Sequence, residues 1–386
     1  MRGDELLHAV IEHPDDTHTR LVYADWLEDQ GEVDRAILIR MQAALVDVPE
    51  HDYRWIECRS WAADHPDAHA QPPLPAGVRW SGPYRAIPER LGVLDVDAFL
   101  AHAPELFANA PIRALDVDAR EAHFRLDRLV ASRWLDRITE IRFTLGSFGS
   151  EQIRQLEQLT AIESLELGYE GVTAEGLHTL VGCRFAQRLE TLVLPYNFFL
   201  RHGLGIEAFR EAKLPRLRHL DVRKNRIDGS MVRAITENPS LGLTRLSLSE
   251  NPIGDAGWRA IAESKLPLEH LDLGKTHPRV AGVRALASSP LARTLETLKI
   301  DHDKLGPQAI AALLSSPWPE LEFLDISSQR FTESALFMLA TTSAFPKLQR
   351  ADLRPLPTRG YGDSPWTQRL AAWFESTTRM RSQHPL

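Results

Sequence analysis

A six-residue phrase recurs ten times along this chain: an apolar residue, two variable residues, an apolar residue, one variable residue and a further apolar residue. The copies start at positions 112, 138, 162, 189, 217, 243, 268, 295, 321 and 348. Clear examples are LRHLDV from Leu217, LEHLDL from Leu268 and LEFLDI from Leu321. The alternation within the phrase is typical of a strand with one buried face. Its regular recurrence predicts one structural unit stacked many times rather than a set of ordinary globular domains.

The copies are spaced by 24 to 28 residues, which leaves room for a helix between consecutive strands. Returning segments such as AGWRAIAES and QAIAALLSS place apolar residues three and four apart, as helices do. Over about two thirds of the chain, the pattern resembles the ribonuclease-inhibitor-like class of leucine-rich repeats. This resemblance implies an α/β solenoid, a curved leucine-rich repeat horseshoe with parallel inner strands and outer helices. A small all-α module is expected to precede it.

In that class the ninth position of each repeat is usually Asn, whose side chain bonds backbone groups at the turn that leaves the strand. The corresponding residues here are Arg120, Gly146, Glu170, Asn197, Asn225, Asn251, Thr276, Asp303 and Gln329. We therefore expect regular turns in the middle of the array and less regular turns toward its N-terminal end.

The segment of residues 4–47 reads as three short helices with enough apolar residues for a small core. Its sequence, especially RLVYADWLE from Arg20, resembles the bacterial repeat-companion domain. No activity is established for that family. The resemblance therefore implies a bacterial protein with a helical module beside the repeats, and a separate docking module stays open as the alternative.

These patterns predict five segments. Residues 1–50 form the acidic helical module, and residues 51–84 form a helix around Trp55 and Trp61 followed by a Pro/Gly-rich linker. Residues 85–111 are the N-terminal cap of the array, residues 112–355 are the repeats, and residues 356–386 are a C-terminal cap helix. Caps are expected because a terminal repeat would otherwise expose its apolar face.

The net charge of −8 is concentrated at the N-terminus. Residues 1–50 hold 12 Asp and Glu against 4 Lys and Arg, a difference of −8, so the remaining 336 residues are neutral overall. A nucleic-acid binder needs clustered basic residues, so nucleic acid is not expected as a partner. The sequence has no long apolar run and no signal-like N-terminus, so we expect a cytoplasmic protein with no membrane contact. We also expect the protein to be monomeric.

The sequence offers no catalytic, cofactor or metal signature. The two cysteines, Cys58 and Cys183, have no metal-binding spacing, and the pair His65 and His69 lacks a third ligand. No phosphate-binding glycine loop, nucleophile elbow or zinc-protease motif is present. We therefore expect a protein that is not an enzyme and needs no cofactor or metal.

Two features bear on binding. Position five of the phrase is acidic in six of ten repeats, which is typical of this repeat class and is interpreted as a solvated sheet surface, with a surface for a basic partner as the alternative. The longest gap, 28 residues, follows the repeat that begins at Leu189, and aromatic and basic residues gather in and beside this lengthened loop. The predicted protein-binding residues are Tyr169, Tyr196, Phe198, Arg201, His219, Arg223, Lys224 and Arg245.

These features predict a non-catalytic protein-binding scaffold that uses the concave face and the irregular loop, with another protein of unknown identity as its partner. Local packing of the loop is the alternative explanation for its aromatic residues. The second candidate function is a recruitment adaptor whose acidic N-terminal helical module is the docking element.

Overall fold

The computed structural model divides the chain into two compact units. The N-terminal unit comprises Met1–Ser147 and Gln155–Glu166, and the C-terminal unit comprises Phe148–Arg154 and Leu167–Leu386. The structure describes residues 3–46, 48, 53–69, 71–82, 85–144, 146, 148–169, 171–197, 205–303, 305–329 and 332–353. The predicted C-terminal cap helix over residues 356–386 lies outside the described residues, as do Phe198 and Arg201 of the irregular loop.

The N-terminal unit begins with four helices: α1 (Gly3–Glu12), α2 (Thr17–Asp29), α3 (Val33–Ala43) and α4 (Tyr53–Asp64). The carboxylate of Asp16 accepts a hydrogen bond from the backbone N–H of His18, which caps the start of α2. Val10, Leu27 and Leu38 are fully buried between the helices. The predicted small all-α module is therefore present, and α4 adds the buried ring of Trp55 to its core.

The strands of the N-terminal unit form a sheet whose order follows the chain. They are β1 (Val78–Trp80), β2 (Arg90–Val93), β3 (Ala114–Asp118), β4 (Glu140–Thr144) and β5 (Ser164–Leu167), with β5 ending at the boundary of the unit. Strands β2, β3 and β4 are parallel. Helices α5 (Val96–Asn109) and α6 (Ala119–Val130) follow β2 and β3, which gives the strand–helix alternation that the repeats predict.

The sequence-based assignment of a plain linker before residue 85 is wrong in part. Strand β1 lies within this stretch and pairs antiparallel with β2, with Val78 opposite Val93. Gly77 directly precedes β1 and has a φ of +87°, a conformation that favours glycine. Its carbonyl accepts hydrogen bonds from the N–H groups of Leu94 and Asp95, which directly follow β2. A three-residue strand depends on its partner for stability, so the local pattern alone does not reveal it.

The C-terminal unit alternates strands with helices, and the described part of the segment between β6 and β7 holds the short 3-10 helix η6 (Ile206–Arg210). Its strands after β5 are β6 (Thr191–Val193), β7 (His219–Asp221), β8 (Arg245–Ser247), β9 (His270–Asp272), β10 (Thr297–Lys299), β11 (Phe323–Asp325) and β12 (Arg350–Asp352). Its helices are α7 (Ser150–Gln155), α8 (Ala174–Gly182), α9 (Val232–Thr236), α10 (Gly254–Ala262), α11 (Val280–Ala287), α12 (Pro307–Leu313) and α13 (Glu333–Thr341).

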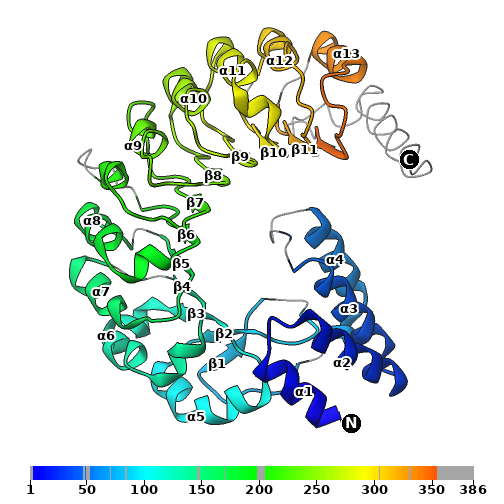
Figure 1. Cartoon of the computed structure of the whole chain (residues 1–386), viewed down its shortest axis with the longest axis vertical. Coiled ribbons are helices and arrows are strands. Elements are labelled where there is room, and N and C mark those ends of the chain that lie inside the picture. Colours follow the sequence, from blue (N-terminus) through cyan, green and yellow to red (C-terminus); the bar gives the residue numbers. More distant parts are fainter. Residues whose placement is uncertain are drawn as a thin grey trace, which may run out of the picture. The chain divides into compact units, whose positions relative to one another are not determined.

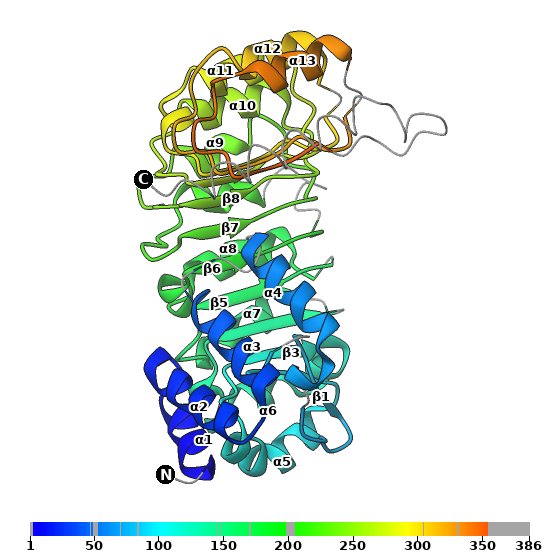
Figure 2. The same cartoon turned by 90° about the vertical axis from the view of Figure 1, so that its right-hand side faces the viewer.

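Strands β6 to β12 are parallel and in register, so that one repeat position forms a row across the sheet. Within this unit the strands lie on the inner, concave side and helices α9 to α13 on the outer side (Figure 1). Strands β6, β7 and β8 run side by side in the second view (Figure 2). The predicted α/β solenoid with parallel inner strands and outer helices is confirmed.

Buried amides hold consecutive repeats together. Oδ1 of Asn225 accepts from the N–H of Asn197 at 2.7 Å, and Oδ1 of Asn251 accepts from the N–H of Asn225 at 2.8 Å. The Nδ2 group of Asn225 donates to the carbonyls of Leu194 and Val222 at 2.7 and 2.9 Å. Each amide thus satisfies backbone groups that would otherwise be buried without partners. The expected regular turns in the middle of the array are present.

Asp303 occupies the same repeat position but cannot reproduce this pattern when ionised. Its Oδ1 accepts from the N–H of His277 at 2.7 Å, whereas its buried Oδ2 has no hydrogen-bond partner among the described residues. Burial raises the pKa of Asp303 to about 8. A protonated carboxyl supplies one O–H donor, so the neutral form is the closer substitute for the amide.

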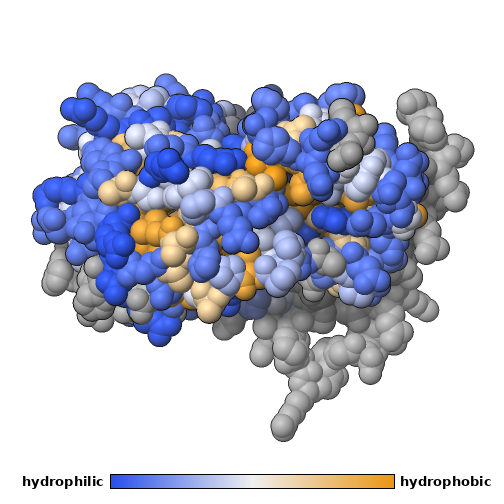
Figure 3. All heavy atoms as spheres, turned by 90° about the horizontal axis from the view of Figure 1, so that it is seen from below, coloured by the Kyte–Doolittle hydropathy of each residue, from blue (hydrophilic) through white to orange (hydrophobic). Residues whose placement is uncertain are grey.

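Hydrophilic residues cover most of the face shown in Figure 3, and hydrophobic residues form small groups between them. Tyr169, which is 55% exposed, is one of the few large hydrophobic side chains that are exposed among the described residues. Over the same residues, no helix has both the length and the apolar character needed to cross a membrane.

Candidate functional site

The eighth position of the repeat forms a row of left-handed residues along one rim of the C-terminal unit. Its members are Tyr169, Tyr196, Lys224, Glu250, Lys275, His302 and Ser328, all with φ between 54° and 63°. A positive φ is uncommon for residues other than glycine, and here it recurs in every one of these repeats. The backbone shape therefore belongs to the repeat, whereas the side chain at this position differs from repeat to repeat. We name this row the rim row.

The first three members of the rim row stack on one another. The rings of Tyr169 and Tyr196 lie with their centroids 5.2 Å apart and an interplanar angle of 21°. The ammonium group of Lys224 lies 4.0 Å from the centroid of the Tyr196 ring. Glu250 then pairs with both Lys224 and Lys275, each at 3.6 Å. Side chains of five consecutive repeats thus form one continuous chain of contacts.

Beside the rim row, the third position of the repeat places basic side chains across the inner face. The register pairs His219 of β7 with Arg245 of β8, and Arg245 with His270 of β9. Burial lowers the pKa of His219 to about 4, and the positive charges of Arg245 and Arg223 act in the same direction. His219 is therefore neutral at pH 7, while Arg223 and Arg245 carry the positive charge of this region.

Arg245 is held in an environment that disfavours its charge. Burial lowers the pKa of its guanidinium, although the carboxylate of Glu269 acts against this effect. Its Nε group is buried and has no hydrogen-bond acceptor among the described residues. Arg223, by contrast, is about half exposed and pairs with the buried carboxylate of Asp221 at 3.4 Å. Arg223, two residues beyond the end of β7, and Arg245 on β8 offer donors from adjacent repeats.

The acidic row at position five is engaged within the protein. In the N-terminal unit, Asp116 pairs with Arg90 at 3.0 Å, and Glu166 pairs with Arg142 at 2.6 Å. In the C-terminal unit, burial raises the pKa of Asp272 to about 6. These observations support the interpretation that the acidic row belongs to the repeat structure rather than to a surface for a basic partner.

The structure brings together six of the eight predicted binding residues. Tyr169, Tyr196 and Lys224 form the stacked part of the rim row, and His219, Arg223 and Arg245 lie on the adjoining inner face. Phe198 and Arg201 lie outside the described residues and stay predictions. Glu250 and Lys275 extend the row but were not predicted. Their shared eighth position in the repeat was the signal that could have identified them.

The other groups considered in the sequence have structural explanations. The ring of His65 stacks on Trp61 with centroids 4.0 Å apart, and its Nδ1 lies 2.8 Å from the Trp61 carbonyl oxygen. Cys58 and Cys183 are buried and form no disulfide. The described residues contain no group of three or more His, Cys, Asp or Glu side chains placed to hold a metal ion.

Comparison with known proteins identifies the repeat. A family model described as "Leucine Rich repeat" matches residues 243–262, which contain strand β8 and helix α10. The matched residues form one of the repeats of the solenoid. A comparison of this chain with curated proteins gives no match.

Solved structures with similarity to this chain include Rad7 and Elc1 in complex from yeast, at 16% identity over 64% of this chain and 71% of that chain, with a TM-score of 0.46. LegL7 from Legionella pneumophila is 16% identical over 69% of this chain and 91% of its own, with a TM-score of 0.48. An internalin from Listeria monocytogenes is 15% identical over 63% of this chain and 61% of its own, with a TM-score of 0.37.

Proposed function

We propose that this leucine-rich repeat protein is a non-catalytic protein-binding scaffold. Its binding surface is the inner face of strands β6 to β9 together with the rim row from Tyr169 to Lys275. The observation that carries this proposal is the exposed stack of Tyr169, Tyr196 and Lys224 along consecutive repeats. The irregular loop that contains Phe198 and Arg201 is part of the proposed surface, as the sequence predicts.

The stack is better explained by binding than by folding. The same backbone conformation occurs with Glu250, His302 and Ser328 at the equivalent position, so the fold does not require tyrosine there. An exposed Tyr169 leaves apolar ring surface in water. Tyrosine and arginine are also the residues on which protein interfaces concentrate their binding energy.

The charges of this surface support a partner that presents an acidic segment. Arg223 and Lys224 have side chains that are 45% and 39% exposed, whereas the side chain of Asp221 is only 8% exposed. Arg245 adds a further cation on the next strand. A carboxylate from a partner would supply an acceptor for these donors, and arginine binds carboxylates with favourable two-point geometry.

The inner face supplies part of a standard protein interface. Seven parallel strands, β6 to β12, span on the order of 30 Å across the strands at about 4.8 Å per strand, and each three-residue strand is about 10 Å long. An interface of average size buries about 800 Å² on each partner. Such an interface therefore extends from the strands onto the rim row and the loops beside it.

The adaptor function remains a second candidate because the N-terminal helices carry exposed acidic residues. Glu5, Glu12 and Asp29 are exposed on α1 and α2. The same helices are attached to the first repeats, where Arg20 pairs with Glu89 and Arg113 pairs with Asp15. These contacts support a module that is integrated into the N-terminal unit, which favours the scaffold over a separate docking module.

A site-specific cross-linking experiment tests the proposal. A photo-reactive amino acid replaces Lys224 in one full-length protein and the exposed Arg259 of helix α10 in a matched control. We expect a partner to be cross-linked to the protein that carries the photo-reactive amino acid at position 224. The same partner should not be cross-linked to the protein that carries it at position 259. Cross-linking only through position 259 would contradict the proposed surface.

A matched pair of triple variants measures the contribution of the surface. Since each anchor residue typically contributes more than 1 kcal/mol to binding, Tyr196→Ala, Arg223→Ala and Arg245→Ala together should weaken partner binding by roughly 100-fold or more. The control combines Arg259→Ala, Lys265→Ala and Arg284→Ala, three exposed cations outside the proposed surface. Equal affinity of the two variants would show that the inner face does not bind.

A third variant separates the two candidate functions. Glu5→Gln, Glu12→Gln and Asp29→Asn together remove negative charge from the N-terminal helices without touching their core. The scaffold proposal expects unchanged partner affinity. A loss confined to this variant would support the adaptor.

A further inference from the structure

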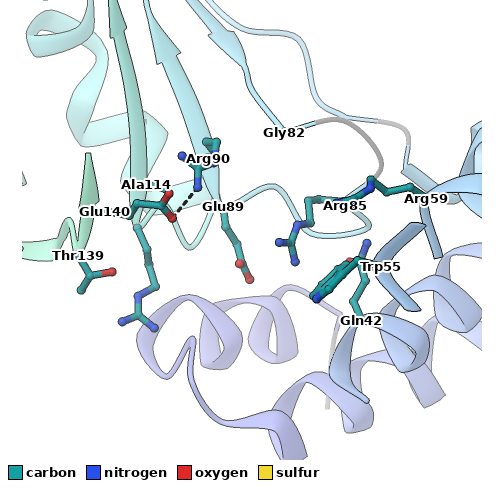
Figure 4. A pocket seen from close by; sticks show the side chains of 11 residues that line it. Gln42, Trp55, Arg59, Gly82, Arg85, Glu89, Arg90, Ala114, Thr139 and Glu140 are labelled. Atoms are coloured by element: carbon teal, nitrogen blue, oxygen red, sulfur yellow. Dashed lines mark ion pairs between the residues drawn. The ribbon is translucent and has the colours of Figure 1, made fainter. Parts of the chain in front are cut away.

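A pocket of about 340 Å³ lies within the N-terminal unit. It is bounded by helices α3 and α4, by the segment that precedes β2, and by the first residues of strands β2, β3 and β4 (Figure 4). Its volume falls at the lower end of the range for small-molecule sites. The proposed protein-binding surface lies in the C-terminal unit, so protein binding at that surface does not explain this pocket.

One wall of the pocket is formed by the strands and is balanced in charge. Arg90, Ala114 and Glu140 are the first residues of three adjacent strands and are paired in register. The guanidinium of Arg90 lies 2.5 Å from Glu140 Oε2 and 3.0 Å from Asp116 Oδ1. The carboxylate of Glu89 pairs with Arg20. Arginine and carboxylate groups thus fix one another on this side.

The opposite wall is formed by the helices and is aromatic and cationic. The guanidinium carbon of Arg85 lies 4.6 Å from the ring centroid of Trp55, whose side chain is buried. The indole Nε1–H donates to the carbonyl of Val48 at 2.7 Å, which fixes the ring. Arg59 follows Trp55 by one turn of α4 and also lines the pocket. Figure 4 shows Trp55, Arg85 and Arg59 together on one side, with Arg90 and Glu140 on the other.

This arrangement has a defined chemical preference. Four arginines and two glutamates line the pocket, a formal excess of two positive charges. The guanidinium of Arg85 lies over the Trp55 ring, and a guanidinium is a planar fork of N–H donors that can bind two oxygens of one anion. Glu140 on the strand wall offers acceptors for hydroxyl groups. The two glutamates also disfavour a polyanion such as nucleic acid.

We propose that the pocket binds a small organic anion, with its carboxylate or phosphate group at the wall of Trp55, Arg59 and Arg85 and its hydroxyl groups toward Glu140. The anionic group supplies oxygens to the cationic wall, and the hydroxyl groups match the acceptors opposite. The shared chemistry is an anion joined to a polyol.

Three six-carbon probes test the proposal with the full-length protein. They are gluconate, glucose 6-phosphate and glucose. Isothermal titration measures affinity, and the indole N–H signal of Trp55, assigned by its absence in Trp55→Phe, reports where the probe binds. We expect at least one of the two anions to bind at one site with a Kd on the order of 1 mM or below. Glucose should bind at least roughly tenfold more weakly because it lacks the anionic group. The stronger anion identifies carboxylate or phosphate as the preferred group.

Variants connect binding to the cationic wall. Arg85→Gln should weaken anion binding at least roughly tenfold, and Arg85→Lys should have an intermediate effect because it keeps the charge but loses the planar fork. Arg120→Gln, which removes an exposed cation paired with Asp118 outside the pocket lining, is the matched control and should bind as the unmodified protein does.

Three results would overturn the proposal. The first is the absence of saturable anion binding up to concentrations on the order of 10 mM. The second is equal binding of glucose and the two anions. The third is anion binding that leaves the Trp55 signal unmoved or is equally strong in Arg85→Gln and the control, which would indicate adventitious binding elsewhere.

Discussion

The ammonium group of Lys224 lies over the ring of Tyr196, 4.0 Å from its centroid, and the two residues occupy the same position of adjacent repeats. The contact with Tyr196 raises the pKa of Lys224, and the carboxylate of Glu250 acts in the same direction. The pair is exposed, so we expect its contribution to folding to be small. The contact between Lys224 and Tyr196 therefore shapes the surface of the protein more than it stabilises the core.

A double-mutant cycle tests this interpretation. Tyr196→Leu and Lys224→Met, alone and combined, should each change the free energy of unfolding less than a change at a buried Asn of the same unit. The two changes should still be coupled, because removing either partner removes the cation–π contact. Denaturant unfolding of the four proteins gives the coupling. Strictly additive effects would show that the contact does not persist in solution.

Asn225→Ala should destabilise the C-terminal unit strongly. The change removes an acceptor for the N–H of Asn197 and donors for the carbonyls of Leu194 and Val222, all of which are buried. We expect a loss of about 3 kcal/mol, since each buried backbone group left without a partner costs about 1–3 kcal/mol. Denaturant unfolding provides the measurement. Lys265→Ala, an exposed change in the same unit, should stay within about 0.5 kcal/mol of the unmodified protein.

Asp303→Asn should stabilise the protein increasingly as the pH rises. Burial raises the pKa of Asp303 to about 8 in the folded state, above its ordinary value of 3.8. Between these two values the folded state binds more protons than the unfolded state, so this residue lowers the stability as the pH rises through the window. The slope from one such group is at most about 1.4 kcal/mol per pH unit.

Free energies of unfolding for the two proteins at pH 5 and pH 8 give the measurement. The advantage of Asp303→Asn should be greater at pH 8. A difference that does not change with pH would show that the carboxyl is not held in its neutral form.

His219 should remain neutral down to a pH well below the ordinary range for histidine. Burial lowers its pKa to about 4, and the charge of Arg245 is the next cause. Arg245→Gln should therefore raise the pKa of His219 toward 6.5. A titration of the imidazole signals by nuclear magnetic resonance measures both values.

The lowered pKa of His219 also makes the stability of the folded state depend on pH. Between pH 6.5 and about 4 the folded state binds fewer protons at His219 than the unfolded state does, so the contribution of His219 to stability falls as the pH falls through this window. A pKa near 6.5 in the unmodified protein would place the imidazole of His219 in solvent and contradict its burial.

The local sequence pattern was sufficient to predict the strands and helices of the repeat. Apolar residues at fixed spacing specify both the strands and the returning helices, because each unit can bury its apolar face only against the next. Leu217, Leu243 and Leu268 are accordingly fully buried, as their place in the phrase requires. The Asn residues at position nine likewise indicated the buried amide bonds, through the resemblance to the repeat class.

Other features depended on residues distant in sequence. Strand β1 exists because Val78 finds Val93 as its partner, and the pocket exists because helix α4 brings Trp55 near Arg85 and Glu140. Nothing within the segment that carries Trp55 indicates which strands it will face. The prediction of Tyr169, Tyr196 and Lys224 as surface residues came from sequence, but their stacking was not predicted.

The sequence alone determined that this chain is a solenoid, since a periodic pattern of buried residues leaves no other way to cover the apolar face of each unit. The tertiary structure decided which variable positions meet. Side chains 25 to 30 residues apart become neighbours only when the repeats are stacked in register, so the Tyr196–Lys224 contact, the pKa of Asp303 and the arginine-lined pocket all depend on that stacking.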